Sequence, residues 1–258
     1  MNKRYTLLLT ACIDPSVSNY KKNPSFRMDT ATRLNDYKIA LDYWLNYSDS
    51  RLKNIVFIEN SGFDISPLRQ LVNQHLIKDV KVEFIEKLAG PVPSGVHYGY
   101  SELEMIDYAF KNSLLIAESD YIIKATGRLY FPKLRELLSK LPADFKIAID
   151  SRDYNILKRE KHFLVTTIFV FSKAFYNDVL YDAKAKLTTK HVHIEKLYFS
   201  ILKPLYLNKE NGVILRFPFS VDPVGIGAHF NVNYSSKKKR FESAFRDIVR
   251  VLVPNLWI

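Results

Sequence analysis

The chain has 258 residues, of which 47% are hydrophobic and 14% aromatic, and it carries a formal net charge of +11. This size and apolar content suit one large α/β domain or two small ones. No apolar run approaches the roughly 18 residues of a membrane span, and the single Cys12 excludes an internal disulfide and a cysteine-based zinc site. The positive charge predicts attraction to polyanions, which include nucleic acid, anionic lipid headgroups and phosphorylated substrates.

Predicted strands and helices alternate through the first 150 residues. Short apolar, β-rich runs that end at turn residues predict buried strands, and apolar residues at helical spacing predict helices. In chain order the sequence predicts a strand at 5–10, a polar loop at 14–28, a helix at 29–47, a strand at 54–58, a helix at 64–76, a strand at 80–85, a loop at 90–99, a helix at 101–115, a strand at 121–124, a helix at 132–141 and a strand at 146–149. This order predicts parallel strands joined by helical crossovers.

The remaining residues predict a less regular arrangement. An apolar, β-branched run is followed by two helices and a segment rich in glycine. These elements are a strand at 163–171, helices at 174–182 and 193–202, short strands and glycine loops at 213–234, and a final helix from residue 237. The chain shows no internal repeat and no interdomain linker. We therefore expect a single α/β domain with a mostly parallel central sheet flanked by helices, followed by a C-terminal amphipathic helix.

The C-terminal segment is basic and amphipathic. Lys237-Lys238-Lys239-Arg240 opens it, and Trp257 stands near its end. Its apolar residues recur at helical spacing and are Phe241, Ala244, Phe245, Ile248, Val249 and Leu252. Basic charge, an apolar stripe and a terminal aromatic residue suit a helix at a membrane surface. A packed helix with a solvated basic face has the same periodicity, so both interpretations stay open.

The most informative stretch is Ser-Asp-Tyr-Ile-Ile-Lys-Ala-Thr-Gly-Arg at 119–128. It predicts a buried strand that breaks at Gly127. Lys124, Thr126 and Arg128 would then gather at the carboxyl edge of the sheet, where open α/β folds bind ligands. Two cations and a hydroxyl beside a glycine suit a diphosphate or a sugar. The alternative is a strand followed by a turn with solvated charges.

Polar residues also follow the other predicted strands, and parallel strands would align them along one edge. We expect this edge to bind a nucleotide. His229 of a glycine-rich loop could reach a phosphate, or it could be a solvated loop side chain. The predicted binding residues are Thr10, Asp14, Glu59, Asn60, Lys124, Thr126, Gly127, Arg128 and His229.

Asp150 and Asp153 follow the strand at 146–149 and could coordinate Mg²⁺ or Mn²⁺ through carboxylate oxygens. Equally, Asp150 could cap a turn while Asp153 pairs with Arg152. Without a metal, Lys124 and Arg128 would have to neutralise a leaving diphosphate.

Glu195 stands in the first turn of a predicted helix. The helix dipole favours a carboxylate there, which is one explanation of its position. The functional interpretation makes Glu195 a general base that deprotonates an acceptor hydroxyl. His191 and His193 precede it, but they are two residues apart and lack the i, i+4 spacing of a zinc-binding helix.

Three features in order resemble one family: Tyr98-Gly99 with Glu102 at a helix start, Lys-Ala-Thr-Gly-Arg at 124–128, and Ile-Glu-Lys-Leu-Tyr at 194–198. Together they resemble bacterial glycosyltransferases that build lipopolysaccharide O-antigens and capsules. Those enzymes carry a Lys-x-Thr-Gly-Arg-Tyr strand end, and here Leu129 displaces the tyrosine to position 130. The resemblance covers roughly residues 1–205.

The resemblance implies a GT-A-like fold, a nucleotide-sugar donor, and a lipid-linked or growing glycan acceptor at the cytoplasmic membrane face. Two features depart from the family pattern. A clean Asp-x-Asp is missing, because 150–153 reads Asp-Ser-Arg-Asp, and the typical Gly-Lys-Gly before Tyr-Gly is Gly-Val-His at 95–97.

These observations predict a hexosyltransferase that moves a sugar from a nucleotide diphosphate to a glycan hydroxyl with inversion. Retention stays open, because the sequence fixes no nucleophile or base by geometry. Its glycosyltransferase domain would span residues 1–235, with a nucleotide-sugar half at about 1–155 and an acceptor half at about 156–235. Residues 236–258 would form the basic helix, and the protein would sit in the cytoplasm, peripherally at the inner face of the cytoplasmic membrane.

Two other functions compete with this one. A nucleic-acid-binding protein or nuclease would use the basic surface, but it predicts aromatic residues interleaved with Lys and Arg. Here the aromatic residues are spread through apolar strands and helices, so we expect no nucleic-acid partner. A non-catalytic membrane-associated scaffold would leave the aligned polar strand ends unexplained.

Overall fold

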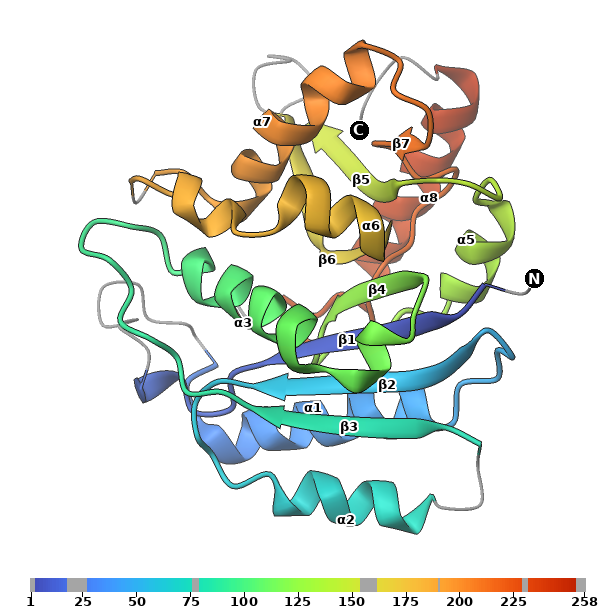
Figure 1. Ribbon diagram of the computed structural model, residues 1–258. Coiled ribbons are helices and arrows are strands. Elements are labelled where there is room, and N and C mark those ends of the chain that lie inside the picture. Colours follow the sequence, from blue (N-terminus) through green and yellow to red (C-terminus); the bar gives the residue numbers. More distant parts are fainter. Residues whose placement is uncertain are drawn as a thin grey trace.

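A seven-stranded sheet forms the centre of the protein, with helices on both of its faces (Figure 1). The computed structural model describes residues 3–17, 27–75, 79–153, 162–189, 191–228 and 232–253. The strand order is β3-β2-β1-β4-β6-β5-β7. The strands are β1 (Tyr5–Ala11), β2 (Leu52–Glu59), β3 (Lys81–Glu86), β4 (Tyr121–Thr126), β5 (Ile147–Asp153), β6 (His162–Ser172) and β7 (Val213–Ile214).

Most strand pairs are parallel, as predicted. β1 pairs in parallel with β2 and with β4, β2 with β3, and β5 with β7. All seven residues of β1 are buried, which explains why its sequence lacks the alternation of exposed polar and buried apolar residues. The parallel registers align Thr10 of β1 with Thr126 of β4 and with Ile58 of β2, so the carboxyl ends of these strands share one edge.

Helices cover both faces of the sheet. They are α1 (Thr30–Leu45), α2 (Ser66–Gln74), α3 (Gly99–Asn112), α4 (Leu114–Ala117), α5 (Leu134–Lys140), α6 (Lys173–Phe175), α7 (Ile194–Leu207) and α8 (Lys237–Leu252), with short turns η1 (Pro15–Val17), η3 (Tyr176–Leu180, a π-helix) and η4 (Ala183–Lys186). Asp29 caps α1 by accepting a hydrogen bond of 2.7 Å from the Thr32 N–H. Pro67 occupies the first turn of α2, as its fixed φ favours.

Two hydrophobic cores lie on opposite faces of the sheet. Leu7 and Leu9 of β1 belong to the core that contains α1 and α5. Leu8 belongs to the other core, which contains α3 and α7. Because side chains alternate along a strand, Thr10 points to the same face as Leu8, toward α3 and α7.

Three features differ from the sequence-based expectation. β6 runs antiparallel to both of its neighbours. The helix expected at 101–115 breaks at Ser113, whose hydroxyl caps α4 and donates a hydrogen bond of 2.6 Å to Glu83. The helix expected at 174–182 is a three-residue helix followed by the π-helix η3.

The fold class predicted from the sequence is confirmed. The structure has one mostly parallel sheet flanked by helices, and a separate amphipathic helix, α8, ends the described chain. The boundary between a nucleotide-sugar half and an acceptor half stays a prediction. Among the described helices, none is long and apolar enough to cross a membrane.

Candidate functional site

A group of polar side chains lies near the carboxyl ends of β1 and β4. These side chains come from β1, β4, β6, α3 and α7 and contact one another. The Lys124 ammonium donates to a carboxylate oxygen of Glu102 and, at 2.9 Å, to the Thr166 carbonyl. The Thr166 hydroxyl donates to Glu195 Oε1 at 3.1 Å, and the Thr10 hydroxyl donates to Glu102 Oε1 at 3.2 Å. We call these five residues the carboxylate cluster: Thr10, Glu102, Lys124, Thr166 and Glu195.

Both carboxylates of the cluster belong to the first turn of a helix. Glu102 lies in the first turn of α3 and Glu195 in the first turn of α7. The positive end of each helix dipole favours an acidic side chain there. Both helices cover the same face of the sheet, so the cluster forms where their first turns converge on the strand ends.

Lys124 has a different place from the one that the sequence predicted. Ile122 packs into the core under α3 and α7, and two residues later Lys124 points to the same side. Its side chain is 0% exposed, so its ammonium cannot touch a diphosphate in this conformation. A buried ammonium requires a charged or hydrogen-bonding partner, and Glu102 with the Thr166 carbonyl supplies both. Lys124 therefore holds Glu102 in place and is not exposed at the edge of the sheet.

The environment of Glu195 favours its neutral form. Burial raises the pKa of Glu195 above its ordinary value of 4.5, and the nearby Glu102 carboxylate raises it further, while hydrogen bonds from its own backbone N–H and from Thr166 lower it. The net shift is upward. A carboxyl whose pKa moves toward neutrality is better matched to proton transfer at physiological pH.

Tyr98 stands close to both carboxylates. Burial raises the pKa of the Tyr98 hydroxyl, Glu195 and Glu102 raise it further, and the Arg128 guanidinium lowers it. Tyr98 is therefore a protonated phenol near the cluster, able to donate a hydrogen bond.

Two histidines connect the first turns of α3 and α7. The ring centroids of His97 and His193 lie 4.1 Å apart. His97 Nδ1 accepts a hydrogen bond of 3.1 Å from the Gly99 N–H at the start of α3, and His193 is the N-cap residue of α7. This contact ties the two carboxylate-bearing turns together.

Gly127 allows the turn after β4 to reach the end of β1. Its N–H donates to the Thr10 carbonyl at 2.9 Å. A Cβ atom at this position would lie 2.8 Å from the Thr10 carbonyl oxygen. The next residue, Arg128, is half-buried, and its Nε is buried with no hydrogen-bond partner in the described part of the chain. Arg128 thus keeps hydrogen-bonding capacity at this edge.

Glu59 and Asp14 are occupied by the protein itself. Glu59 is 0% exposed, and its carboxylate accepts from the N–H groups of Ile13 at 2.9 Å, Ser61 at 2.8 Å and Gly62 at 2.9 Å. It fastens the ends of β1 and β2 and is not free to hold a nucleotide, contrary to the prediction. Asp14 accepts from the Ser16 N–H at 2.8 Å, and hydrogen bonds from Ser16 lower its pKa.

Three further residues were predicted to bind the nucleotide: Asn60, Thr126 and His229. The Asn60 side chain is buried, and its Oδ1 has no hydrogen-bond partner among the described residues. Thr126 is half-buried at the end of β4. His229 lies outside the described residues.

The predicted metal site does not fit the structure. Asp150 is buried, and its carboxylate accepts from Arg250 Nη2 at 2.7 Å, Arg152 Nε at 2.9 Å and the Phe217 N–H at 3.1 Å. Two guanidinium groups already neutralise this carboxylate, so it is a poor ligand for a cation. The backbone of Asp153 continues β5, but its side chain lies outside the described part of the structure. Within the described segments, no group of three or more His, Cys, Asp or Glu side chains could hold a metal ion.

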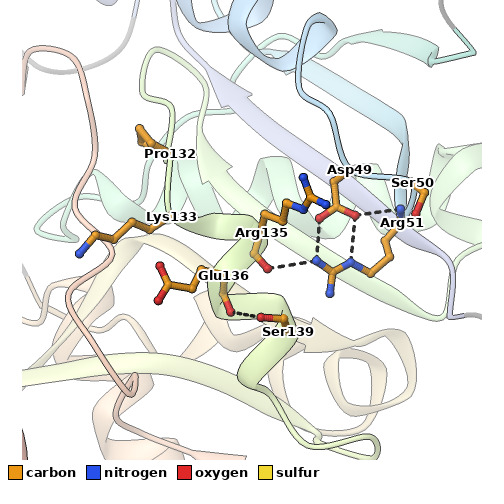
Figure 2. Close-up of a pocket in the computed structure, with 8 residues that line it drawn as sticks. All are labelled: Asp49, Ser50, Arg51, Pro132, Lys133, Arg135, Glu136 and Ser139. Carbon is orange, nitrogen blue, oxygen red and sulfur yellow. Dashed lines mark hydrogen bonds and ion pairs between the residues drawn. The ribbon is translucent and has the colours of Figure 1, made fainter.

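A separate surface depression of about 700 Å³ lies at the other edge of the sheet (Figure 2). Residues 49–51, which line it, immediately precede β2 and therefore lie at the amino end of that strand. The Arg51 guanidinium hydrogen-bonds the Asp49 carboxylate at 2.7 and 2.9 Å and the Arg135 carbonyl at 3.1 Å, as Figure 2 shows. These contacts pair the charges of Asp49 and Arg51 with each other. The carboxylate cluster lies at the carboxyl edge, where open α/β folds bind ligands, and is therefore the better candidate site.

Sequence reasoning missed part of the cluster. Glu102 entered only through its place in the family resemblance, although an acidic residue at a helix start is a visible signal. Thr166 gave no signal, because it lies inside the apolar run of β6 and its role depends on the antiparallel pairing with β4.

No protein-family model matches the sequence, and a search of curated proteins finds no significant match. Solved structures do resemble the fold. A mannosyltransferase from Pyrobaculum calidifontis, solved with GDP-Man and Mn²⁺, superposes with a TM-score of 0.50 at 12% identity, over 98% of this chain and 65% of its own. This chain therefore spans less than two thirds of that enzyme's length.

Two further structures are more distant. The 4-diphosphocytidyl-2C-methyl-D-erythritol synthase of Anaerococcus prevotii gives a TM-score of 0.46 at 9% identity, covering 95% of this chain and 96% of its own. The inositol-1-phosphate CTP transferase of T. maritima gives 0.42 at 14% identity, covering 84% and 86%. At these identities similarity is evidence of fold alone. The chain thus has an α/β fold like that of the Pyrobaculum mannosyltransferase, and its activity has to be argued from its own side chains.

Proposed function

We propose that the protein is a glycosyltransferase that moves a sugar from a nucleoside-diphosphate donor to a hydroxyl of a lipid-linked or growing surface glycan at the inner face of the cytoplasmic membrane. One observation carries the proposal. Glu102 and Glu195 are joined through Lys124 and Thr166 at the carboxyl edge of the sheet. Ligands of open α/β folds bind at this edge. The fold shared with a mannosyltransferase that binds GDP-Man supports the same reaction class.

Glu195 is the general base of the proposed reaction. Its carboxylate takes the proton of the acceptor hydroxyl as the hydroxyl oxygen attacks the anomeric carbon. The bond between that carbon and the phosphate oxygen breaks, and its electron pair leaves with the nucleoside diphosphate. Attack from the face opposite the leaving group inverts the anomeric centre. The raised pKa of Glu195 suits this proton transfer.

Arg128 is the group we assign to the donor phosphates. Its guanidinium stands beside the glycine turn at the ends of β1 and β4, and its Nε has no hydrogen-bond partner within the described segments. A guanidinium can bind two phosphate oxygens at once and stabilise the charge that develops on the leaving group. Thr10, Thr126, Gly127 and Asn60 complete the proposed donor edge. Because the described acidic side chains form no metal-binding group, we assign no step to Mg²⁺ or Mn²⁺.

A nucleic-acid-binding function has less support. Many large aromatic side chains are buried in the two cores, among them Tyr37, Phe57, Phe169 and Tyr176. Binding of single-stranded nucleic acid requires aromatic faces that bases can stack on, interleaved with cations.

Two measurements test the proposal. In the first, the protein is titrated calorimetrically with UDP, GDP and CDP, and separately with an oligonucleotide of equal charge. At least one nucleoside diphosphate should bind, and the oligonucleotide should not. Glu195→Gln should keep that affinity and lower sugar transfer by about 10²- to 10⁴-fold. The matched control Glu118→Gln changes an exposed acid outside the cluster. Full transfer by Glu195→Gln would remove Glu195 from the mechanism.

A further inference from the structure

Helix α8 packs against the rest of the protein with its charged side. Arg250 is only 6% exposed, and its guanidinium donates to Asp150 at 2.7 Å and to the Phe217 carbonyl at 2.9 Å. Asp247 accepts from the Ser220 N–H at 2.6 Å. These contacts fix which side of the helix turns inward.

The apolar side of α8 therefore faces outward. Its side chains are Phe241, 75% exposed, Phe245, 53%, Ile248, 59%, Val251, 78%, and Leu252, 73%. The spacing of four, three and four residues between Phe241, Phe245, Ile248 and Leu252 places them in one stripe along the helix. A surface helix ordinarily turns such a stripe toward the core. A contiguous exposed apolar patch marks an interaction surface.

Exposed cations border this stripe. Lys237, Lys238 and Arg240 are all exposed. Since successive residues turn by about 100° around a helix axis, Lys238 and Arg240 lie on its two sides and Lys237 at its amino end. Lys239 is paired with Glu242 at 2.7 Å, but no described carboxylate lies within ion-pair distance of the other three.

We propose that the outward face of α8 binds an anionic lipid surface, with the helix axis parallel to the membrane and the apolar stripe inserted among the headgroups. An apolar centre with cations on both sides matches a continuous plane of anionic headgroups over a hydrocarbon interior. The 16 residues of α8 would lie along the surface for about 24 Å. This proposal does not depend on the transferase reaction.

Charge favours lipid over a second copy of the chain. Self-association would also bury the stripe. However, each copy carries a net charge of +11, so two copies repel each other, whereas an anionic membrane attracts this surface. A dimer would also leave the exposed cations of α8 without acidic partners.

Vesicle flotation with the full-length protein tests the proposal. The protein should float with vesicles of phosphatidylglycerol and phosphatidylcholine, and less so with phosphatidylcholine alone or at high salt. Phe245→Ser/Ile248→Ser should lower the partition coefficient by about ten-fold or more, because two large apolar side chains leave the interface. Lys237→Gln/Lys238→Gln/Arg240→Gln should abolish the preference for anionic vesicles. Leu207→Ser, at a 65% exposed position of α7, is the matched control and should bind as the unchanged protein does.

Two outcomes would overturn the proposal. One is vesicle binding that neither the stripe variant nor the charge variant reduces. The other is a dimer in sedimentation that the stripe variant converts to a monomer, without vesicle binding by either form. Thermal melting and nucleoside-diphosphate titration of each variant check that the fold is kept, and they separate this result from a failure of the transferase proposal.

Discussion

Arg250 and Asp150 stand 100 residues apart in the chain and form a buried ion pair of 2.7 Å. The pair holds α8 against the middle of β5, and Arg152 shares the same carboxylate. It explains two findings at once. Asp150 is an anchor rather than a metal ligand, and α8 turns its charged side inward.

Breaking this pair should destabilise the protein. Arg250→Met leaves Asp150 buried with one of its two cationic partners removed, and losing a partner of a buried pair costs about 3–5 kcal/mol. Urea denaturation measures the free energy of unfolding. The control Lys239→Gln breaks the partly exposed pair with Glu242, which should cost at most about 1 kcal/mol. Equal losses for the two variants would show that Arg250 is not an anchor.

Removing the Arg128 guanidinium should weaken donor binding without affecting folding. Arg128→Ala should raise the dissociation constant for the bound nucleoside diphosphate by roughly ten- to a hundred-fold, as expected for one charged hydrogen-bonding group. The melting temperature should stay unchanged. Arg69→Ala removes a cation whose partner is Glu86 and serves as the control in the same calorimetric titration. Unchanged donor affinity in Arg128→Ala would make its turn merely structural.

The Thr166 hydroxyl should tune the pH dependence of transfer. Its hydrogen bond lowers the pKa of Glu195, so Thr166→Val should raise that pKa. A general base must be deprotonated, and the acid limb of kcat/KM should therefore move to higher pH. Thr167→Val is the neighbouring control, because the Thr167 hydroxyl has no hydrogen-bond partner within the described segments. An acid limb that stays in place would separate Glu195 from the rate-limiting proton transfer.

The raised pKa of Glu195 also has a consequence for stability. The folded protein binds this proton more tightly than the unfolded chain does, so the stability that protonation provides is present at low pH and is lost as pH rises through the folded pKa. In Glu195→Gln this contribution to the pH dependence should disappear. Denaturation curves between pH 4 and roughly 8 would show it as a flatter profile than that of the unchanged protein. The same slope in both proteins would contradict the upward shift.

Gly127 should tolerate no side chain. A Cβ atom there would meet the Thr10 carbonyl at 2.8 Å, and that atom belongs to the backbone of a buried strand. Gly127→Ala should lower stability by about 1–3 kcal/mol and weaken nucleoside-diphosphate binding, since Arg128 moves with the turn. Gly90→Ala is the control. It should change stability less, because the added Cβ meets only the end of the flexible Glu104 side chain. A wild-type melting temperature for Gly127→Ala would refute the close approach.

Much of the fold was predictable because local patterns determine it. β1, β2 and β4 are apolar runs that end in polar turns, and these runs coincide with the strands of the structure. The direction of β6 was not predictable, since an apolar run reads the same way in a parallel and an antiparallel strand. Its antiparallel pairing brings Thr166 to Lys124, and so the link between Glu102 and Glu195 emerged only in the structure.

The Lys-Ala-Thr-Gly-Arg strand end shows the same division. Its sequence correctly indicated a strand that stops at a glycine. The sequence could not show that Lys124 is fully buried while Arg128 is only half-buried, because burial depends on what packs above the strand. Under α3 and α7, Lys124 is enclosed with Glu102, while Arg128 lies beyond the strand end.

Helix α8 gives the clearest contrast. The sequence by itself determined that residues 237–252 form an amphipathic helix, with an apolar stripe and a basic start, because helical periodicity is internal to the segment. Which side of that helix meets the protein depends on partners elsewhere in the chain. Asp150 and the Ser220 N–H bind the charged side, and so only the tertiary structure turned the apolar stripe outward.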